Sequence, residues 1–341
     1  TDLVFPFFLF MVGTAMAFSF SRFFDGTVSV RSGYAKLYKR AALIFLIGLL
    51  LNAFPFVTLK TDPNLSFWEN LGRFYSGLRI LGVLQRIAMA YALGGTLALW
   101  LKKPRPIAWA FALTLLLHWG LLFFFGGDEP YSRETNFARV TDLFLLGPKH
   151  LYQGYGLPFD PEGVLGMLSG AGTVLMGYLA GVCIRKNTEK IDAVGSLYTW
   201  GLVSLGAGLA WSIWLPISKP LWTGSYVLYA GGWTLLMLGF FVYLIDIKGK
   251  EKWFMPFKAL GLNPLFAFVL SGLFAKLFGR IIHWQTASGG TATPLGWLYH
   301  NVCVPVFGDN PAGSLAYAVI YVAIFTLMAM VLYKRKIIIK I

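Results

Sequence analysis

Two arginines occur in an apolar stretch, SGLRILGVLQRIAMAYA, where an ionisable side chain is costly if the stretch enters a membrane. Arg79 and Arg86 are seven residues apart, which is two helical turns and predicts one shared face, with Gln85 beside it. Arg79 could snorkel to the external membrane boundary. Arg86 would be deeper by about 10 Å, so it requires a carboxylate partner or a wet cavity. A functional role and a structural ion pair explain Arg86 equally well.

The stretch 127–163 is rich in carboxylates, the natural partners of arginines. Its acidic residues are Asp128, Glu129, Glu134, Asp142, Asp160 and Glu162. Its last part fits a helix start, with Asp160 as N-cap, Pro161 at the first helical position and Glu162 in the first turn. The same two carboxylates could also bind a cationic amine or pair with Arg86. These two interpretations are compatible.

The histidines show no metal-binding pattern. They are His118, His150, His283 and His300, and none has the spacing of a metal site. The sequence also lacks the motifs of a nucleophile elbow, a phosphate-binding loop or a catalytic cysteine. We therefore expect no metal and favour a hydrogen-bonded structural role for each histidine taken alone. His150 differs because it lies in the acidic stretch, ahead of Asp160.

A second candidate site lies in KALGLNPLFAFVL, where Asn263 and Pro264 interrupt an apolar run. Proline removes a backbone donor and breaks or starts a helix, and broken helices within a membrane normally line a cavity. A helix start beside Lys258 could bind an anion. A simple N-cap at the membrane surface is an equally good interpretation.

The elements that position these residues are predicted to be membrane helices. Of the 341 residues, 57% are hydrophobic and only 13% are charged, with a mean hydropathy of +0.65, which is typical of a polytopic helical membrane protein. We therefore predict one all-α transmembrane domain over 1–341. Its nine apolar segments, each long enough to span a bilayer, are 3–21, 41–57, 81–101, 107–125, 164–184, 195–217, 225–246, 259–279 and 314–333.

The charge distribution predicts the orientation. Most of the 29 Lys and Arg residues lie on one set of short connections, which marks the cytosolic side. The C-terminus is then cytosolic and Thr1 external. Because a short external start without a signal sequence is unusual, we expect one further helix upstream, ten in all. Cys183 and Cys303 are predicted to lie on opposite sides and to remain unpaired. Because the charge of +14 is mostly cytosolic, it does not predict nucleic-acid binding.

Glycines mark one face of the segment 164–184. They are Gly166, Gly170, Gly177 and Gly181, which fall on one side of a helix. Such a face favours close helix packing. The alternative is a backbone surface along which a thin ligand lies.

Four blocks of the sequence resemble the transmembrane acetyltransferases typified by heparan-alpha-glucosaminide N-acetyltransferase and its shorter bacterial relatives. The blocks are DLVFPFFLFMVG at 2–13, LRILGVLQRIA at 78–88, KHLY with FDPEGVLG between 149 and 166, and GLNPLFAFV at 261–269. They occur in the family's order and cover the chain to about residue 270. The resemblance implies acetyl transfer from cytosolic acetyl-CoA to an amino sugar across the membrane. It also implies a histidine about ten residues before Asp2, a position upstream of Thr1.

Residue roles follow from this resemblance. It implies functional importance for Asp2, Arg79, Gln85, Arg86, His150, Asp160, Glu162 and Asn263. The chemistry of these side chains predicts catalytic roles for Asp2, Arg86 and His150, and substrate contacts for Arg79, Gln85, Asp160 and Glu162. It also predicts CoA contacts for Lys258 and Asn263 at the cytosolic helix start. An amine must be neutral to attack a thioester, so a histidine suits the base. Arginines could donate to the thioester carbonyl. The pantetheine arm could lie along the glycine face.

The expected partners are acetyl-CoA, an amino-sugar acceptor and membrane lipid, with no nucleic acid; a homo-oligomer is compatible with the sequence. The resemblance to shorter relatives favours the plasma membrane of a bacterium, its inner membrane. A multi-pass transporter of an amino sugar is the alternative, since broken helices and buried arginines also suit transporters. No inverted halves support it. A purely structural membrane protein is disfavoured by Arg86.

Overall fold

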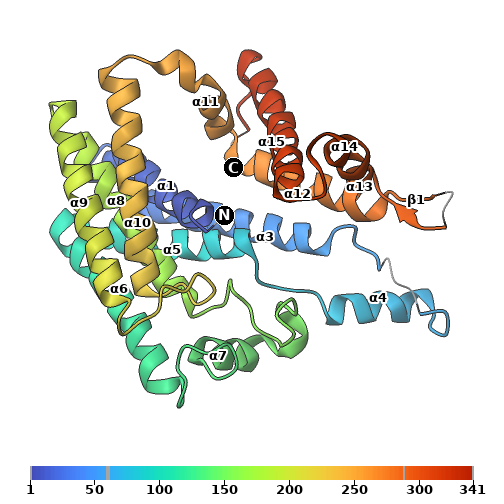
Figure 1. Cartoon of the computed structure of the whole chain (residues 1–341). Helices are drawn as coiled ribbons and strands as arrows, with labels where there is room; N and C mark the ends of the chain where they lie inside the picture. Colours follow the sequence, from blue (N-terminus) through green and yellow to red (C-terminus); the bar gives the residue numbers. More distant parts are fainter. Residues whose placement is uncertain (1, 59–61, 287–288, 340–341) are drawn as a thin grey trace. The chain divides into compact units, whose positions relative to one another are not determined.

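The computed structural model describes residues 2–58, 62–286 and 289–339. The chain is mainly helical and divides into two compact units, one of 1–53 and 68–249 and the other of 54–67 and 250–341. Figure 1 traces the helices in sequence order. The expectation of one transmembrane domain stays a prediction, because two compact units can belong to the same membrane domain.

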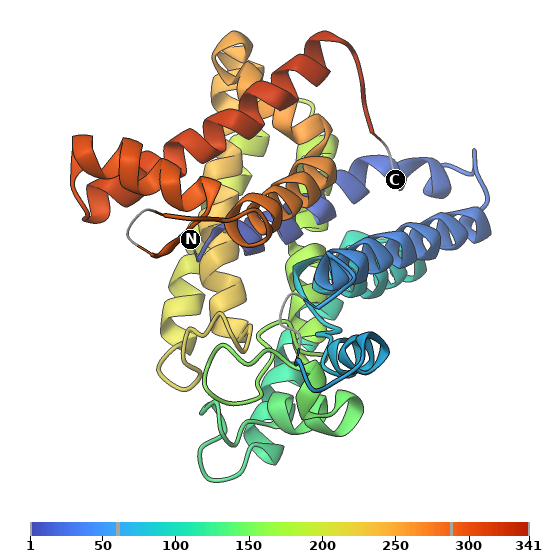
Figure 2. The same cartoon turned by 90° about the vertical axis from the view of Figure 1, so that its right-hand side faces the viewer.

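The first unit contains the long helices that surround the candidate site. Its helices are α1 (Val4–Ser19), α2 (Ser21–Phe24), α3 (Val30–Ala53), α4 (Phe67–Ser76, all but its first residue), α5 (Val83–Leu101), α6 (Pro104–Phe125), α7 (Phe137–Leu146), the short 3-10 turn η1 (Pro148–His150), α8 (Gly166–Lys186), α9 (Lys190–Trp211) and α10 (Gly224–Val242), continued by the π-helical turn η2 (Tyr243–Ile247). Helix α8 packs against α1, α5 and α6, while α9 packs along α10, as Figures 1 and 2 show.

The second unit is built from shorter pieces. It contains the 3-10 turn η3 (Glu251–Phe254), α11 (Met255–Leu262), α12 (Pro264–Lys276), the π-helical turn η4 (Leu277–Ile281), the antiparallel pair β1 (Trp284–Gln285) and β2 (Thr291–Ala292), α13 (Pro294–Leu298), the π-helical turn η5 (Tyr299–Cys303), α14 (Val304–Phe307) and α15 (Pro311–Lys334). The predicted segment 259–279 is divided at Asn263, which confirms the interruption expected from the Asn-Pro pair.

Helices occur at all nine predicted positions, but the count of nine membrane spans is not confirmed. In the part of the chain that the structure describes, six helices are long and apolar enough to cross a membrane: α6, α8, α9, α10 with η2, α12 with η4, and α15. Helix α1 is apolar but shorter, at 16 residues. The first half of α3 carries several basic residues. The orientation stays a prediction.

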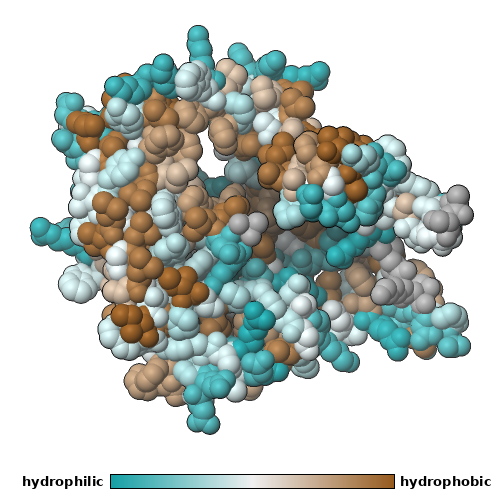
Figure 3. Space-filling model, in the orientation of Figure 1, coloured by the Kyte–Doolittle hydropathy of each residue, from teal (hydrophilic) through white to brown (hydrophobic). Residues whose placement is uncertain are grey.

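On the face seen in Figure 3, hydrophobic side chains lie on the outer surface, interspersed with polar ones. Trp200, Ile213 and Trp214 on and just after α9 are 63%, 75% and 67% exposed, values that suit a lipid-facing surface rather than a water-facing one. Cys183 and Cys303 are both free thiols, and their placement on opposite membrane faces stays a prediction.

The glycine face of α8 is filled by neighbouring helices. A Cβ at Gly177 would collide with the carbonyl oxygen of Phe10 in α1, and one at Gly13 would collide with the carbonyl oxygen of Val174. The hydroxyl of Thr14 donates to the carbonyl oxygen of Gly177 at 3.1 Å. Close packing therefore explains these glycines, and the pantetheine path along this face is wrong, because α1 already occupies the space.

Candidate functional site

Arg79 is the centre of a charged cluster in the first unit. Its Nε lies 2.9 Å from Oδ2 of Asp160 and its Nη2 lies 2.6 Å from Oδ1, so the pair is bidentate. Nη2 also pairs with Glu162, and the guanidinium lies 4.8 Å from the ring centroid of Tyr152. Burial disfavours the guanidinium charge, but the hydrogen bond and charge of Asp160, helped by Glu162, outweigh burial, so the pKa of Arg79 lies above its usual value. Arg79 is therefore ion-paired rather than snorkelling.

Asp160 organises the loop that carries both carboxylates. Besides Arg79, it accepts hydrogen bonds from the backbone N–H groups of Tyr152 and Glu162, at 3.2 and 3.0 Å. The prediction that Asp160 caps a helix starting at Pro161 is wrong, because α8 begins only at Gly166. The bond from the Glu162 N–H forms a local side-chain turn, which is an alternative to capping for this residue type. Asp160 is thus a loop-fixing carboxylate, 2% exposed.

The shared helical face predicted for Arg79 and Arg86 is not formed. Helix α5 begins at Val83, so Arg79 lies in a non-helical segment that precedes it. Gln85 donates to the carbonyl oxygen of Ile80 at 2.9 Å, and Asn52 donates to the carbonyl oxygens of Arg79 and Leu81. These bonds satisfy the backbone of the extended segment and explain why it is not helical. Gln85 therefore holds the segment that carries Arg79 in place through its bond to Ile80.

His150 lies against the same segment. Its Nδ1 is 2.7 Å from the carbonyl oxygen of Leu78, and its own backbone carbonyl accepts from the N–H of Ile80 at 3.2 Å. An Nδ1–H tautomer donates in this geometry. These bonds attach the turn η1 to the non-helical segment before α5. The structure thus gives His150 a positioning contact next to Arg79.

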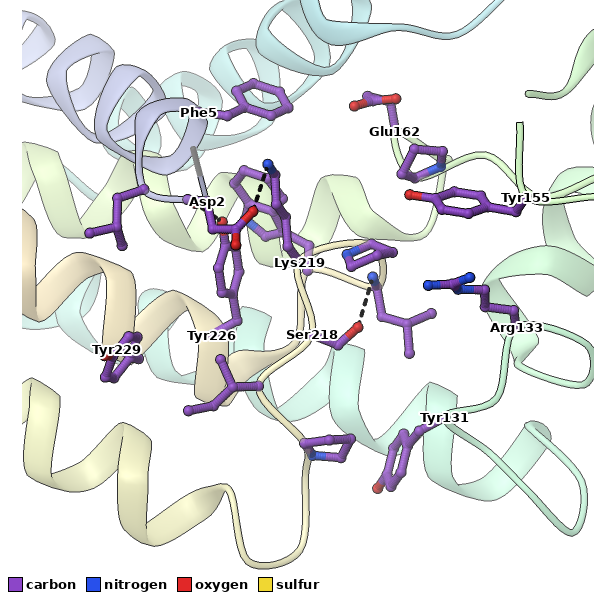
Figure 4. Close-up of a pocket in the computed structure, with 17 residues that line it drawn as sticks. Asp2, Phe5, Tyr131, Arg133, Tyr155, Glu162, Ser218, Lys219, Tyr226 and Tyr229 are labelled. Carbon is purple, nitrogen blue, oxygen red and sulfur yellow. Dashed lines mark hydrogen bonds and ion pairs between the residues drawn. The ribbon is translucent and has the colours of Figure 1, made fainter. Parts of the chain in front are cut away.

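A pocket of about 870 Å³ opens beside this cluster. Its lining comes from the chain start, the acidic stretch and the loop before α10: Asp2, Leu3, Phe5, Tyr131, Arg133, Tyr155, Pro161, Glu162, Pro216, Ile217, Ser218, Lys219, Pro220, Leu221, Trp222, Tyr226 and Tyr229. We call it the Asp2–Glu162 pocket. Figure 4 shows Asp2 and Lys219 directed toward one another, with an Nζ–Oδ1 distance of 3.2 Å. The hydroxyl of Tyr226 donates to the backbone carbonyl of Asp2.

The chemistry of the pocket is mixed. Glu162 and Asp2 offer carboxylates, Arg133 and Lys219 offer cations, and the rest of the wall combines aromatic rings with aliphatic side chains and prolines. Aromatic rings combined with a few charged groups suit a ligand that has both an apolar face and polar substituents. The sequence analysis missed Lys219, Trp222 and the pocket tyrosines. Lys219 and Trp222 lie between the predicted segments 195–217 and 225–246, and two of the tyrosines lie in the acidic stretch 127–163. Those positions were the only signal.

Arg86 is held differently from Arg79. It is 1% exposed, and its guanidinium lies 4.9 Å from the ring centroid of Trp222. Its Nη2 is 3.4 Å from the carbonyl oxygen of Gly163, a weak contact, while Nε and Nη1 have no hydrogen-bond partner. The predicted carboxylate partner is therefore not in direct contact, because Asp160 and Glu162 are engaged by Arg79.

The second unit holds the remaining predicted residues. The side chain of Asn263 donates to the carbonyl oxygen of Ile337 at 3.1 Å and accepts from the N–H of Ile339 at 2.7 Å. It thus binds the C-terminal segment rather than capping α12. Lys258 pairs with Glu251 on the surface, and each partner moves the other's pKa toward the charged form through the hydrogen bond between them. The side chains of Lys258 and Asn263 therefore contact different groups and do not form one site.

No group of three or more His, Cys, Asp or Glu residues suited to a metal ion occurs within residues 2–58, 62–286 and 289–339. The apolar helices and the charged site together define an all-α membrane protein with an internal polar site.

Two known proteins are similar in sequence to this chain. The chain is 27% identical over 395 aligned residues to heparan-alpha-glucosaminide N-acetyltransferase of Mus musculus, and 24% identical over 391 to that of Homo sapiens. Each alignment covers 98% of this chain and 54% or 53% of the relative, so the chain spans about half the length of these curated relatives. No protein-family model matches. The two similarities support membership of the heparan-alpha-glucosaminide N-acetyltransferase family.

Proposed function

We propose that this chain is the transmembrane core of an N-acetyltransferase that transfers an acetyl group from cytosolic acetyl-CoA to an amino sugar on the external side of a bacterial plasma membrane. The observation that carries the proposal is the Asp2–Glu162 pocket, which combines carboxylates with aromatic rings in a chain similar to N-acetyltransferases over 98% of its length. An amino sugar presents hydroxyls, an apolar ring face and an ammonium group. Those three features match the lining.

The carboxylates of the pocket would bind the incoming ammonium group and sugar hydroxyls. Glu162 has the better position, because its side chain is 14% exposed and is anchored by Arg79. Asp2 is 77% exposed at its side chain and paired with Lys219, so it would contribute at the rim. The tyrosine rings would pack on the sugar face. Arg79, Gln85 and His150 would hold this arrangement in place.

The acetyl donor would be activated by Arg86. Its unpartnered N–H groups could donate to the thioester carbonyl, where negative charge develops during attack. On the cytosolic side Lys258 stays a proposed contact of the CoA phosphates. The Asn263 side chain holds the C-terminal segment, so it would act only by shaping the start of α12. Lys258→Ala and Asn263→Ala variants with unchanged acetyl-CoA affinity would move that site elsewhere.

Proteoliposomes with the full-length protein test the function. Radiolabelled acetyl-CoA is supplied on one face and glucosamine on the other, and we expect acetylated sugar to accumulate on the sugar side. Unmodified glucosamine crossing the bilayer without acetylation would instead establish a carrier and overturn the proposal.

A further inference from the structure

The four ionisable side chains that line the Asp2–Glu162 pocket differ in how their charges are paired. They are Asp2, Glu162, Arg133 and Lys219. Lys219 pairs with Asp2, and Arg79, which does not line the pocket, pairs with Glu162. In the part of the chain that the structure describes, no carboxylate forms an ion pair with Arg133. The pocket wall therefore carries one cation whose charge the protein leaves unpaired.

The side chain of Arg133 rests on an aromatic ring that is itself held in place. Its guanidinium lies 4.4 Å from the ring centroid of Tyr155. The Tyr155 ring contacts that of Tyr152 at a centroid distance of 5.5 Å and that of the buried Phe159 at 5.7 Å. A guanidinium stacked on a ring keeps its N–H donors at its edge, where a ligand can accept from them. Arg133 is thus oriented before a ligand arrives, which lowers the entropy cost of binding.

Hydrogen bonds also fix the loop that carries Arg133. The hydroxyl of Thr135 donates to the carbonyl oxygen of Glu129 at 2.6 Å, and the side chain of Asn136 donates to the carbonyl oxygen of Ser132 at 2.5 Å. The other carboxylates near Arg133 in the sequence do not line the pocket: Asp128, Glu129 and Glu134. The loop therefore presents a cation to the pocket without an accompanying anion.

The opposite charge lies further along the same wall. Figure 4 shows Glu162, Tyr155 and Arg133 following one another along the side of the pocket that faces Asp2 and Lys219. Arg79 pairs with Oε2 of Glu162, and Oε1 is left for a ligand. An acceptor for an ammonium group and an unpaired set of donors thus lie on either side of a tyrosine ring. This order suits a ligand with an ammonium group, an apolar face and an anionic group.

From this arrangement we infer that the pocket selects an amino sugar that carries an anionic group, and that Arg133 is the residue that recognises this group. The ammonium group lies at Glu162, and the anionic oxygens accept from the guanidinium of Arg133. A guanidinium matches the two oxygens of a carboxylate or a phosphate with parallel hydrogen bonds. Both groups share this chemistry. The inference rests on the proposed function and narrows its acceptor from any amino sugar to an acidic one.

Acceptor specificity of the full-length protein tests the inference. Proteoliposomes receive acetyl-CoA and two matched pairs of acceptors: glucosamine 6-phosphate with 6-O-methylglucosamine, and muramic acid with its methyl ester. In the parent protein we expect kcat/KM to be about tenfold higher for at least one charged acceptor than for its uncharged counterpart, as for one charged hydrogen bond. A preference for the first pair's charged member identifies a phosphate ester, and one for muramic acid identifies a carboxylate.

Substitution of Arg133 should remove this preference selectively. For Arg133→Gln we expect the preference to fall to about twofold or less, while kcat/KM for the uncharged acceptors is retained. Arg133→Lys should keep part of it, because lysine retains the charge but not the planar fork. Arg105→Gln is the matched control: Arg105 is exposed in the first turn of α6, outside the pocket lining, and its variant should keep the parent preference. Unfolding temperatures check that each variant folds.

Binding measurements separate failure of this inference from failure of the proposed function. Calorimetry with the same four sugars and without acetyl-CoA measures affinity when no transfer can occur. A parent protein that transfers no acetyl group to any acceptor overturns the proposed function, whatever it binds. The acidic-acceptor inference is overturned if the parent favours neither charged sugar in transfer and in binding. It is also overturned if Arg133→Gln keeps the parent preference, the result expected when Arg133 only packs on Tyr155.

Discussion

Arg79 and Arg86 are seven residues apart, but the structure treats them in opposite ways. Arg79 forms a bidentate pair with Asp160, a second pair with Glu162 and a contact with the ring of Tyr152. Arg86 is more deeply buried and leaves two of its nitrogens unpartnered. A guanidinium that is paired with two carboxylates can hold a loop but has fewer donors left for a ligand. A buried guanidinium with unpartnered donors holds no loop in place but can donate to a ligand.

This difference indicates a positioning role for Arg79 and a chemical role for Arg86. Removing one member of a buried ion pair leaves its partner uncompensated and is strongly destabilising. Removing a charge that has no close partner relieves desolvation and costs little stability. The Arg79 and Arg86 sites should therefore respond differently to the same substitution.

The largest effect is expected for Arg86→Gln. We expect the rate of acetyl transfer to fall by about 100- to 1000-fold, because a preorganised donor to the developing oxyanion is lost. The unfolding midpoint should stay unchanged or rise, since no close ion pair is broken. Transfer assays and thermal unfolding in detergent measure both quantities. Unaltered transfer would remove Arg86 from the mechanism.

Arg79→Gln should mainly affect stability. It leaves the buried Asp160 carboxylate without its bidentate partner, which we expect to destabilise the protein by about 3 kcal/mol. Arg79→Lys should recover only part of this loss, because a lysine cannot form the forked pair. Chemical denaturation of both variants gives the comparison, and a stable Arg79→Gln protein would contradict the positioning role.

The two carboxylates that bind Arg79 should differ from each other. Asp160→Asn disturbs bonds to Arg79, Tyr152 and Glu162, so it should lower the unfolding temperature. Glu162→Gln keeps those bonds and should raise the KM for the amino sugar by roughly tenfold, in line with loss of one charged contact. Steady-state kinetics with glucosamine on the pocket side distinguish them. Equal effects on KM and on stability in both variants would argue against this division.

The smallest predicted effect is the pH dependence of stability that Asp142 contributes. Burial raises the pKa of Asp142 to about 7, while the N–H of Val164 opposes the rise. Because the pKa of the folded protein lies above the usual value of 3.8, the folded state binds this proton more tightly than the unfolded state. Stability from this group is therefore full below about pH 4 and is lost as pH rises to about 7.

Asp142→Asn should flatten this dependence. The slope removed cannot exceed about 1.4 kcal/mol per pH unit for one proton. The change in pH dependence would appear in the unfolding free energies of the parent and the variant between pH 4.5 and 7.5. Repeated denaturation should determine each value to about 0.3 kcal/mol. Parallel pH profiles would mean that Asp142 is not the group that titrates.

Much of the architecture was predictable because it depends on local composition. Long apolar segments form helices wherever they occur, and a helix was found at each predicted position, with the break at Asn263 in place. The association of arginine with the carboxylates of FDPEGVLG was also predictable from charge. The partner was predicted as Arg86, whereas Arg79 holds both carboxylates, because the segment before Val83 is extended and brings Arg79 to them.

The sequence by itself determined that this chain is helical and apolar, that it carries buried arginines and an acidic loop, and which family it resembles. Local composition and residue order are sufficient for these properties. Only the tertiary structure decided that Gly177 serves packing, that Arg79 rather than Arg86 pairs with Asp160, and that the loop before α10 completes the Asp2–Glu162 pocket. These facts depend on contacts between segments far apart in the sequence, such as that between Asp2 and Tyr226, which are 224 residues apart. Such contacts are fixed by how α1, α6 and α8 pack, and no local pattern encodes them.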